Sequence, residues 1–389
     1  MKAIIMVGGY ATRLQPISLR TPKCLLPIGG KSNLERIIES LVKAGIKDII
    51  ISLNSTQKKV KDFFKDGNNH GAKITYIEEI TTEDSNKLGA VGGLKYVVDK
   101  IGVDDYLVIG GDNFFDGLNV KEFMEAHKKS GKLVTLALYA LPNKEMIIHT
   151  GVALVKNGRI VEFQEKPSMK EAKSQLSSVM FYAINKEFFS KYLEEYLSYK
   201  KGKGEKPDNL GEMWQYFADK IYLNAFEFKG RWWDIGTHKN YIKVNEHALK
   251  IFNQLPFYPN ITLIPPVLID KNVVIKKGSV IGPNVQVMKG AVIGNNSIIK
   301  NSIIFENVEI GNNSEISDSV IDANVLVKKH STIENSIIGY KSEVNNRLVK
   351  NSKIWPFVKT RDNIIEDLIL RNDLLGIEQE ELMNSKYWE

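Results

Sequence analysis

The sequence predicts an α/β domain with a mostly parallel mixed sheet, followed by a parallel β-helix built from hexapeptide repeats. Two observations lead to this prediction. Up to about residue 250, apolar runs of strand type alternate with amphipathic runs of helix type, which is typical of a sheet with helices on both faces. Beyond the proline-punctuated segment 255–266, aliphatic residues recur every six positions, a period that helices do not have.

The first half opens with a buried strand over 3–7 that ends in Gly8-Gly9. Asn157-Gly158 separates two β-rich runs in "GVALVKNGRIVEF" and predicts a hairpin. The polar, glycine-rich stretch 199–209 is interpreted as a mobile loop. In such a sheet we expect ligands outside the carboxyl ends of the strands. Further expected elements are a helix over 34–44, the strand "DIIISL", a helix near 91–99, a strand over 106–112 and a helix over 120–130.

The second half predicts stacked triangular coils whose aliphatic ladder forms a core. After the hexads the repeat becomes seventeen residues, and seventeen is three sixes less one, so one side of each coil is shortened. The amphipathic "IIEDLILRNDLL" beyond residue 364 predicts a capping or partner helix. We expect domains at 1–250 and 267–355, a linker at 251–266 and a helical tail at 356–389. The ladder residues are Ile269, Ile275, Ile281, Val287, Ile293 and Ile299, followed by Ile316 and Ile333.

The composition is that of a globular protein and restricts its partners. The 389 residues are 43% hydrophobic and 25% charged, enough for two domains with sizeable cores. The net charge of +7 is spread without a basic block, which favours a small anionic substrate over a nucleic acid. The single cysteine, Cys24, excludes an intrachain disulfide and a zinc cluster of several thiolates. We expect a cytoplasmic protein, because neither a signal peptide nor a membrane-spanning apolar run is recognisable.

The stretch "MVGGYATRLQPISLRTPKCLLPIGG" over 6–30 indicates a loop that receives a phosphate group. It lacks the third glycine of the dinucleotide-binding fingerprint and the Gly-Lys-Ser/Thr ending of the nucleotide-kinase loop. Gly8 and Gly9 allow close backbone approach, and the cations Arg13 and Lys23 follow on a stretch punctuated by prolines.

This stretch resembles the signature of the sugar-nucleotide pyrophosphorylases, G-G-x-G-T-R-L, a proline, then P-K-x-x-x-P. The mannose-1-phosphate guanylyltransferase branch, which also carries a β-helix, is the most similar. The resemblance implies a Rossmann-like nucleotidyltransferase domain, a left-handed β-helix, and Mg²⁺ as cofactor. Ala11 replaces the third glycine of the signature. The matching residues are Gly8, Gly9, Thr12, Arg13, Leu14, Pro16, Pro22, Lys23 and Pro27.

The same resemblance implies roles for residues in other motifs of the first 250 positions. For the nucleotide it implies Gly8, Gly9, Thr12, Arg13, Lys23, Gly89 of "LGAVGGL" and Asp112 of "GGDNFFD". For the metal it implies Asp112 and Asp234 of "GRWWDIGT", and for the sugar Gly151, Glu165 and Lys166 of "FQEKP", and Ser178. Where the family reads N-A-G-I-Y, this chain has "SVMFY" at 178–182, so the sugar contact there departs from the pattern. Arg13, Lys23 and Lys166 are the candidate catalytic residues.

The expected chemistry agrees with these residue types. A sugar 1-phosphate attacks the α-phosphorus of a nucleoside triphosphate in line, and its oxygen is already largely ionised near neutral pH because its second pKa is about 6. A general base is therefore unnecessary. The site must instead hold two repelling anions and stabilise the departing pyrophosphate, which calls for fixed cations and a hard metal ion. Aspartates supply the oxygen ligands that Mg²⁺ prefers.

Each motif also has a simpler interpretation. Asp112 could cap the segment that follows it, Glu165-Lys166 could be a surface ion pair, and Trp232 and Trp233 are interpreted as core or wall residues. His330 in "KKHST" stands at a predicted corner of the β-helix, where an acyltransferase would carry its base.

The sequence predicts formation of an NDP-sugar and pyrophosphate, with GDP-mannose from GTP and mannose 1-phosphate as the first choice. The alternatives are thymidylyl or uridylyl transfer to glucose 1-phosphate, a non-catalytic regulatory subunit, and a bifunctional enzyme with acyl transfer on the β-helix. The exposed coil edges and the tail predict a homo-oligomer formed through residues beyond about 255. Neither a membrane nor a nucleic acid is an expected partner.

Overall fold

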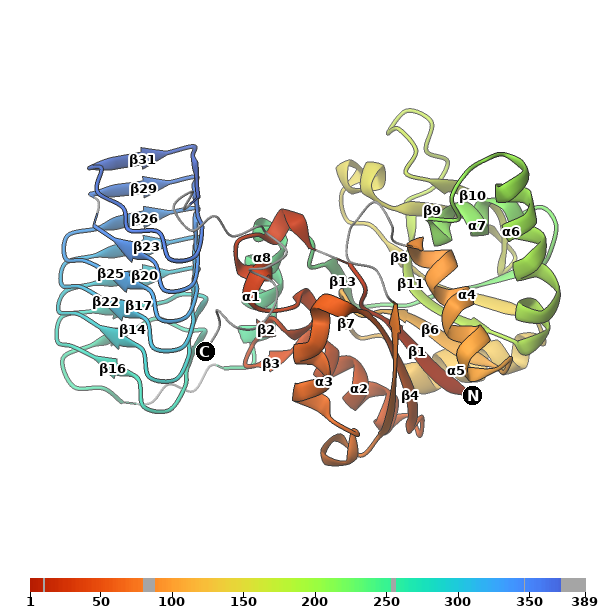
Figure 1. The fold of residues 1–389 in the computed structure, drawn as a ribbon, viewed down its shortest axis with the longest axis horizontal. Coiled ribbons are helices and arrows are strands. Elements are labelled where there is room, and N and C mark those ends of the chain that lie inside the picture. Colours follow the sequence, from red (N-terminus) through yellow and green to blue (C-terminus); the bar gives the residue numbers. More distant parts are fainter. Residues whose placement is uncertain (10, 80–87, 253–256, 346, 372–389) are drawn as a thin grey trace. The chain divides into compact units, whose positions relative to one another are not determined.

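The computed structural model describes residues 1–9, 11–79, 88–252, 257–345 and 347–371 (Figure 1). The chain divides into two compact units that are interleaved along the sequence. The first comprises Met1–Gly9 and Asn33–Trp233, and the second comprises Tyr10–Ser32 and Asp234–Glu389. The part of the signature stretch over 11–32, called the signature loop below, therefore belongs to the same unit as the C-terminal repeats, whereas Gly8 and Gly9 belong to the first unit.

The first unit is built on a nine-stranded mixed sheet in the order β5-β4-β1-β6-β11-β8-β12-β10-β9. Strands β5, β4, β1 and β6 run parallel, as do β8 and β12, whereas β11 is antiparallel to β6 and β8 and β10 is antiparallel to β9 and β12. The bounds are β1 Lys2–Met6, β4 Asp48–Asn54, β5 Lys73–Glu79, β6 Tyr106–Gly110, β8 Val134–Ala140, β9 Gly151–Lys156, β10 Arg159–Glu165, β11 Leu176–Ile184 and β12 Leu223–Glu227. Strand β7 (Asn113–Asp116) pairs separately with β13 (Arg231–Asp234).

Helices pack against this sheet where the amphipathic patterns predict them. Helix α5 contacts β8 and β12, α4 contacts β4 and β5, and α7 contacts β10. The predicted helices over 34–44, 91–99 and 120–130 are confirmed as α2, α4 and α5, and the hairpin is confirmed with Asn157 and Gly158 both at positive φ. The helices are α2 Asn33–Lys43, α3 Lys58–Phe64, α4 Gly89–Ile101, α5 Val120–Ser130, α6 Leu193–Gly202 and α7 Leu210–Phe217, with a π-helical turn over Phe188–Tyr192.

The core of the first unit contains large aromatic side chains between the sheet and helices α4 and α7. Tyr106, Tyr196, Trp214 and Phe217 are fully buried in it. The interpretation of 199–209 as a loop is wrong at its start, because α6 continues to Gly202. In this helix Lys200 is buried, and its ammonium lies 2.8 Å from Glu205 and 2.5 Å from Glu212. The glycine-rich composition of the stretch does not reveal these ion pairs.

The second unit contains a three-sided parallel β-helix (Figure 1). One sheet contains β14 Thr262–Leu263, β17 Val280–Ile281, β20 Ile298–Lys300, β23 Glu315–Ser317, β26 Thr332–Glu334, β29 Leu348–Lys350 and β31 Ile364–Glu366. Another contains β15 Val267–Ile269, β18 Val285–Val287, β21 Ile303–Ile304, β24 Val320–Ile321, β27 Ile337–Ile338, β30 Lys353–Ile354 and β32 Ile369–Leu370. The third contains β16 Val274–Ile275, β19 Val292–Ile293, β22 Glu309–Ile310, β25 Leu326–Val327 and β28 Glu343–Val344.

The aliphatic ladder forms the core of these coils, as the repeat predicts. Ile299, Ile316 and Ile333 stack in register and are completely buried. The strands extend beyond the expected limits at both ends, because β14 lies in the expected linker and β31 and β32 lie where a helical tail was expected. Ile365 is paired with Val349 and continues the ladder, so residues 364–370 form one more coil and not a helix. The rest of the expected tail, 372–389, lies outside the described residues.

The signature loop and one helix complete the second unit. The loop contains short helical turns at Thr12–Leu14 and Lys23–Leu25, helix α1 (Ile17–Arg20), and the paired strands β2 (Pro27–Ile28) and β3 (Lys31–Ser32). Helix α8 (His238–Leu249) holds the end of the loop, because the Tyr241 hydroxyl donates to the Pro27 carbonyl at 2.8 Å and the Asn245 side chain accepts from Gly29 N–H at 2.8 Å. Among the described helices of both units, none combines the length and apolarity needed to cross a bilayer.

Candidate active site

Asp234, Lys23 and Arg13 form one charged cluster in the second unit. Lys23 Nζ lies 2.9 Å from Asp234 Oδ1, and Arg13 Nη2 lies 3.7 Å from Asp234 Oδ2. The Lys23 side chain is only 11% exposed, whereas Arg13 is 65% exposed, so the lysine is fixed and the arginine reaches into solvent. The fold thus brings Arg13 and Lys23 to the carboxylate of Asp234, which lies about two hundred residues later in the sequence.

The start of helix α8 fixes the backbone that carries Asp234. Thr237 caps the helix by accepting from Asn240 N–H at 3.2 Å, and the Asn240 amide donates to the Asp234 carbonyl at 2.9 Å. Gly236 leaves room for the ion pair, because a Cβ there would lie 2.7 Å from Arg13 Nη2 and 2.9 Å from Asp234 Oδ2. Gly236 could not be predicted as a site residue from the sequence, because glycine is required there only once Arg13 is folded against it.

His238, the first residue of α8, makes the stability of this unit pH-dependent. Burial, with a contribution from Lys353, lowers the pKa of His238 to about 4 from 6.5. The unfolded chain therefore binds a proton below about pH 6.5 while the folded chain does not until about pH 4. Stability is full above this window and falls by roughly 3 kcal/mol as the pH decreases through it. The His238→Gln variant should show a flatter dependence of the unfolding free energy on pH between 6.5 and 4; an unchanged slope would contradict this assignment.

Asp112 follows β6 in the first unit and is oriented by its neighbours. The Asn113 side chain donates to Asp112 Oδ1 at 2.8 Å and accepts from Trp232 Nε1 at 2.8 Å. The Asn33 amide donates to the carbonyls of Gly111 (2.9 Å) and Asn113 (3.0 Å), which fixes the turn. Trp232 is buried, as expected of a core residue. Asn113 is a second residue that the sequence analysis missed, although it directly follows Asp112.

Glu165 is the last residue of β10, and its carboxylate is closely surrounded by neighbouring residues. Its carboxylate accepts from the Asn209 amide at 2.7 Å, and its neighbour Lys166 lies 3.5 Å away with a 54% exposed side chain. Gly151 is opposite Glu165 in the sheet, and a Cβ at Gly151 would lie 2.6 Å from Glu165 Oε2. Gly211 is even closer, so both glycines are needed for this carboxylate to occupy its place. Asn209 was not predicted from the sequence.

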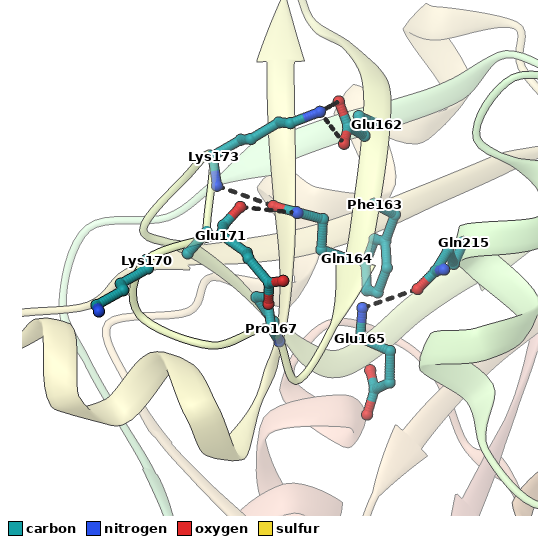
Figure 2. A pocket seen from close by; sticks show the side chains of 10 residues that line it. Glu162, Phe163, Gln164, Glu165, Pro167, Lys170, Glu171, Lys173 and Gln215 are labelled. Atoms are coloured by element: carbon teal, nitrogen blue, oxygen red, sulfur yellow. Dashed lines mark hydrogen bonds and ion pairs between the residues drawn. The ribbon is translucent and has the colours of Figure 1, made fainter.

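A pocket of about 710 Å³ lies beside this strand end (Figure 2). Glu165 contributes to its lining, and its backbone N–H donates to Gln215 Oε1 at 3.0 Å. Lys173 is held across the pocket by an ion pair with Glu162 at 2.8 Å, and its N–H donates to Gln164 at 2.8 Å. The Glu165 side chain points away from these groups in Figure 2. The residues of the pocket wall therefore help to fix the backbone at the end of β10, where Glu165 lies.

The segment that departs from the family pattern forms a bulge in β11. The pairing with β8 shifts register between Ser178 and Tyr182, and Met180 adopts φ 51° at the position where the family has glycine. A left-handed non-glycine residue costs roughly 1–2 kcal/mol, so the bulge is retained at the expense of backbone strain. Ser178 Oγ lies 3.0 Å from the Tyr182 hydroxyl, and burial raises the pKa of Tyr182 to about 12. Ser178 is thus engaged with a neutral tyrosine.

The candidate nucleotide-binding glycines differ in what the fold requires of them. Gly89 has φ +73°, and a Cβ there would lie 2.5 Å from the Asp208 Cα, so local packing alone demands glycine. Gly8 and Gly9 have no atom within 4 Å of an added Cβ and no positive φ. The described surroundings of Gly8 and Gly9 therefore do not themselves require glycine. Ala11 has φ 49°, a conformation that glycine in the family signature adopts without strain.

The structure brings some of the predicted residues together and places others apart. Thr12, Arg13, Lys23 and Asp234 belong to the second unit. The first unit holds Gly8, Gly9, Gly89 and Asp112, together with Gly151, Glu165, Lys166 and Ser178 at the ends of three paired strands. Asp112 and Asp234 therefore come from different units. His330 is exposed at a corner of the β-helix with φ 61°.

Comparison with known proteins agrees with the fold and with these motifs. The family model described as "Nucleotidyl transferase" matches residues 2–251, and the model "GMPPB C-terminal domain" matches residues 263–370. A UTP–glucose-1-phosphate uridylyltransferase from Synechocystis sp. is 26% identical over 79% of this chain and 83% of its own length. A mannose-1-phosphate guanyltransferase from Saccharomyces cerevisiae is 27% identical over 62% and 63%.

A solved structure has the same fold in its catalytic half. The UDP-glucose pyrophosphorylase from Acinetobacter baumanii is 20% identical with a TM-score of 0.53, and the match covers 65% of this chain and 95% of that one. The mixed sheet, the signature loop and the appended β-helix define a nucleotidyltransferase. The chain belongs to the nucleotidyl transferase family, within the sugar nucleotidyltransferases.

Proposed function

We propose that this enzyme forms an NDP-sugar and pyrophosphate with the help of Mg²⁺, and that its substrates are GTP and mannose 1-phosphate. The observation that carries the proposal is the cluster of Lys23, Arg13 and Asp234, which presents two cations from the signature loop and a carboxylate from the end of β13. The match of residues 263–370 to the GMPPB C-terminal domain and the guanyltransferase relatives support the choice of guanosine and mannose.

The donor set fits a magnesium ion. Asp112 and Asp234 offer only oxygen atoms, and Mg²⁺ in phosphoryl-transfer sites uses one or two carboxylates and completes its shell with substrate phosphates and water. In the described part of the chain no three His, Cys, Asp or Glu side chains form a metal-binding group. When bound, the ion would supply positive charge next to the reacting phosphates.

The remaining chemistry belongs to side chains of this chain. The sugar phosphate oxygen forms a bond to the α-phosphorus, while the bond from the α-phosphorus to the bridging oxygen breaks and pyrophosphate leaves with the electron pair. Lys23 and Arg13 bind the triphosphate and offset the charge that accumulates on the leaving group. Lys166 holds the sugar phosphate, and Glu165 and Gly151 orient the sugar. Gly8, Gly9, Thr12 and Gly89 accept the nucleotide, whereas Ser178 borders the sugar.

Uridylyl transfer to glucose 1-phosphate is the second candidate, supported by the Synechocystis relative, which matches the larger share of this chain. Thymidylyl transfer belongs to the same alternative. The test is a matrix of GTP, UTP, dTTP, ATP and CTP against mannose, glucose and N-acetylglucosamine 1-phosphates with Mg²⁺, with release of pyrophosphate as the readout. GTP with mannose 1-phosphate should give the highest kcat/KM. Absence of pyrophosphate with every pair would favour the regulatory-subunit alternative, and consumption of acetyl-coenzyme A would reveal acyl transfer.

The Gly236→Ala variant tests the charged cluster without removing any charge. The added Cβ must displace Arg13 or Asp234, because it would lie within 3.0 Å of both. We expect the KM for the nucleoside triphosphate to rise about tenfold or more, since misplacement by about 1 Å can cost up to 10²-fold in rate. Gly202→Ala in α6, where an added Cβ meets no atom within 4 Å, is the matched control. Equal KM values for both variants and the parent would contradict the role of this cluster.

Assembly and location stay predictions. The last coil exposes Ile364, Leu368 and Ile369, which is consistent with self-association through residues beyond about 255. A cytoplasmic location also remains a proposal.

A further inference from the structure

The signature loop is anchored to the β-helix by a buried ion pair within the second unit. Arg20, the last residue of α1, donates from Nε to Asp322 Oδ1 at 2.9 Å, and its Nη2 lies 2.7 Å from the same oxygen and 3.8 Å from Glu306 Oε2. Leu19 is 2% exposed and packs in the hydrophobic cluster of the β-helix ladder. Lys353 Nζ adds a bond to the Arg13 carbonyl at 2.9 Å.

The coil itself does not require a charged residue at the position of Asp322. Phe305, Asp322 and Gly339 follow the paired residues of β21, β24 and β27, so they are equivalent in three successive coils. Phe305 is buried at this position, and Asp322 is 0% exposed. Within the coil the Asp322 carboxylate accepts only the Ala323 N–H at 2.7 Å among the described residues, and its Oδ2 has no hydrogen-bond partner there. Its compensating charge comes from the signature loop.

Two aromatic rings flank the Arg20 guanidinium and restrict its position. The guanidinium lies 5.7 Å from the ring centroid of Phe305 and 5.4 Å from that of Tyr340, and its side chain is 17% exposed. Burial raises the pKa of Asp322, with Arg20 acting against this effect. Removing one partner would leave a buried charge, whereas replacing both by apolar residues is often neutral for stability. The ion pair therefore specifies where the loop lies more than how stable the unit is.

In the sequence, Arg20 lies between Arg13 and Lys23. It follows Arg13 by seven positions and precedes Lys23 by three, with the turn at Thr12–Leu14 on one side and the turn at Lys23–Leu25 on the other. We propose that Asp322 and Glu306 of the β-helix, through Arg20, are positioning residues that hold Arg13 and Lys23 where they bind the triphosphate. This inference rests on the proposed function of the loop, and it makes the β-helix a part of the catalytic machinery.

The test compares two variants of the full chain with the parent. Asp322→Asn removes the anchoring charge, and the double variant Arg20→Met with Asp322→Leu removes both charges of the fully buried pair and leaves only the partly exposed Glu306 carboxylate. Ile333→Val is the matched control, because it removes one buried methylene group from the ladder, between Ile316 and Val349, and leaves the ion pair of Arg20 with Asp322 intact. For each protein we would measure Tm, kcat, the KM for both substrates, and amide hydrogen exchange over residues 11–25.

The anchored loop should exchange at least tenfold faster in both variants and at the parent's rate in Ile333→Val. The KM for the nucleoside triphosphate should rise at least fivefold in both variants, and the double variant should recover Tm without recovering this KM. A double variant with parental exchange and parental KM would overturn the inference, even if Asp322→Asn fails to fold. Because hydrogen exchange needs no turnover, a parent that releases no pyrophosphate would refute the proposed function and leave the anchoring readout intact.

Discussion

The Asp112→Asn variant is expected to lose about 10²- to 10³-fold in kcat/KM, because the amide keeps the shape of the side chain but removes the charge that, in the proposed function, supports the metal ion. The Asn113 side chain, which donates to Asp112 Oδ1 at 2.8 Å, would face an uncharged group, and the fold would stay intact. Pyrophosphate release at several Mg²⁺ concentrations measures the effect. A partial recovery at high Mg²⁺ would indicate weakened metal binding.

Asp99→Asn is the matched control for this variant. Asp99 is a carboxylate on the surface of α4, paired with Lys95 at 2.6 Å and 54% exposed, so its removal should change activity less than twofold. If Asp112→Asn behaved like Asp99→Asn, Asp112 would be a turn residue and the metal assignment would be wrong.

The Lys23→Met variant is expected to lose about 10²-fold or more in kcat/KM, with the largest change in the KM for the nucleoside triphosphate. Methionine keeps the length of the side chain and removes the ammonium that lies 2.9 Å from Asp234, so Asp234 and, in the proposed function, the triphosphate lose a fixed cation. Steady-state kinetics with each substrate varied separately measures this split. The exposed Lys276 on the β-helix provides the control Lys276→Met.

A different pattern would reassign Lys23. If the KM for the sugar 1-phosphate rose while that for the triphosphate did not, Lys23 would belong to the sugar side of the reaction. An unchanged kcat/KM would show that Arg13 alone is sufficient for the triphosphate.

The sequence was informative wherever one period dominates. The six-residue spacing of aliphatic positions predicts the β-helix because only stacked coils bury such a ladder, and Ile299, Ile316 and Ile333 are accordingly buried. The prediction of a helix at 364–370 is wrong because the spacing of apolar residues in "IIEDLIL" fits an amphipathic helix as well as a β-helix coil. Pairing of Ile365 with Val349 in the ladder favours the coil. Met180 could not be placed from its neighbours, since propensity does not reveal a bulge that keeps a left-handed residue.

The residue types of the site could be predicted, but their supports could not. Arg13, Lys23 and Asp234 stand in motifs with a recognisable spacing, and the structure joins them. Gly236, Asn113 and Asn209 matter only through contacts made after folding, with Arg13, Asp112 and Glu165 respectively. The partnership of Arg20 with Asp322 spans 302 positions, and no local pattern connects residues so far apart.

The interleaving of the two units has a consequence during protein synthesis. Arg20 leaves the ribosome among the first residues, but Asp322 is added 302 residues later, roughly 15–60 s at the usual elongation rates of 5–20 residues per second. A nascent chain that has completed the mixed sheet still lacks the acidic partner of its own N-terminal segment. Termination before residue 322 would therefore leave Arg20 without Asp322, and we expect such a truncated chain to contain the mixed sheet but to lack an anchored signature loop.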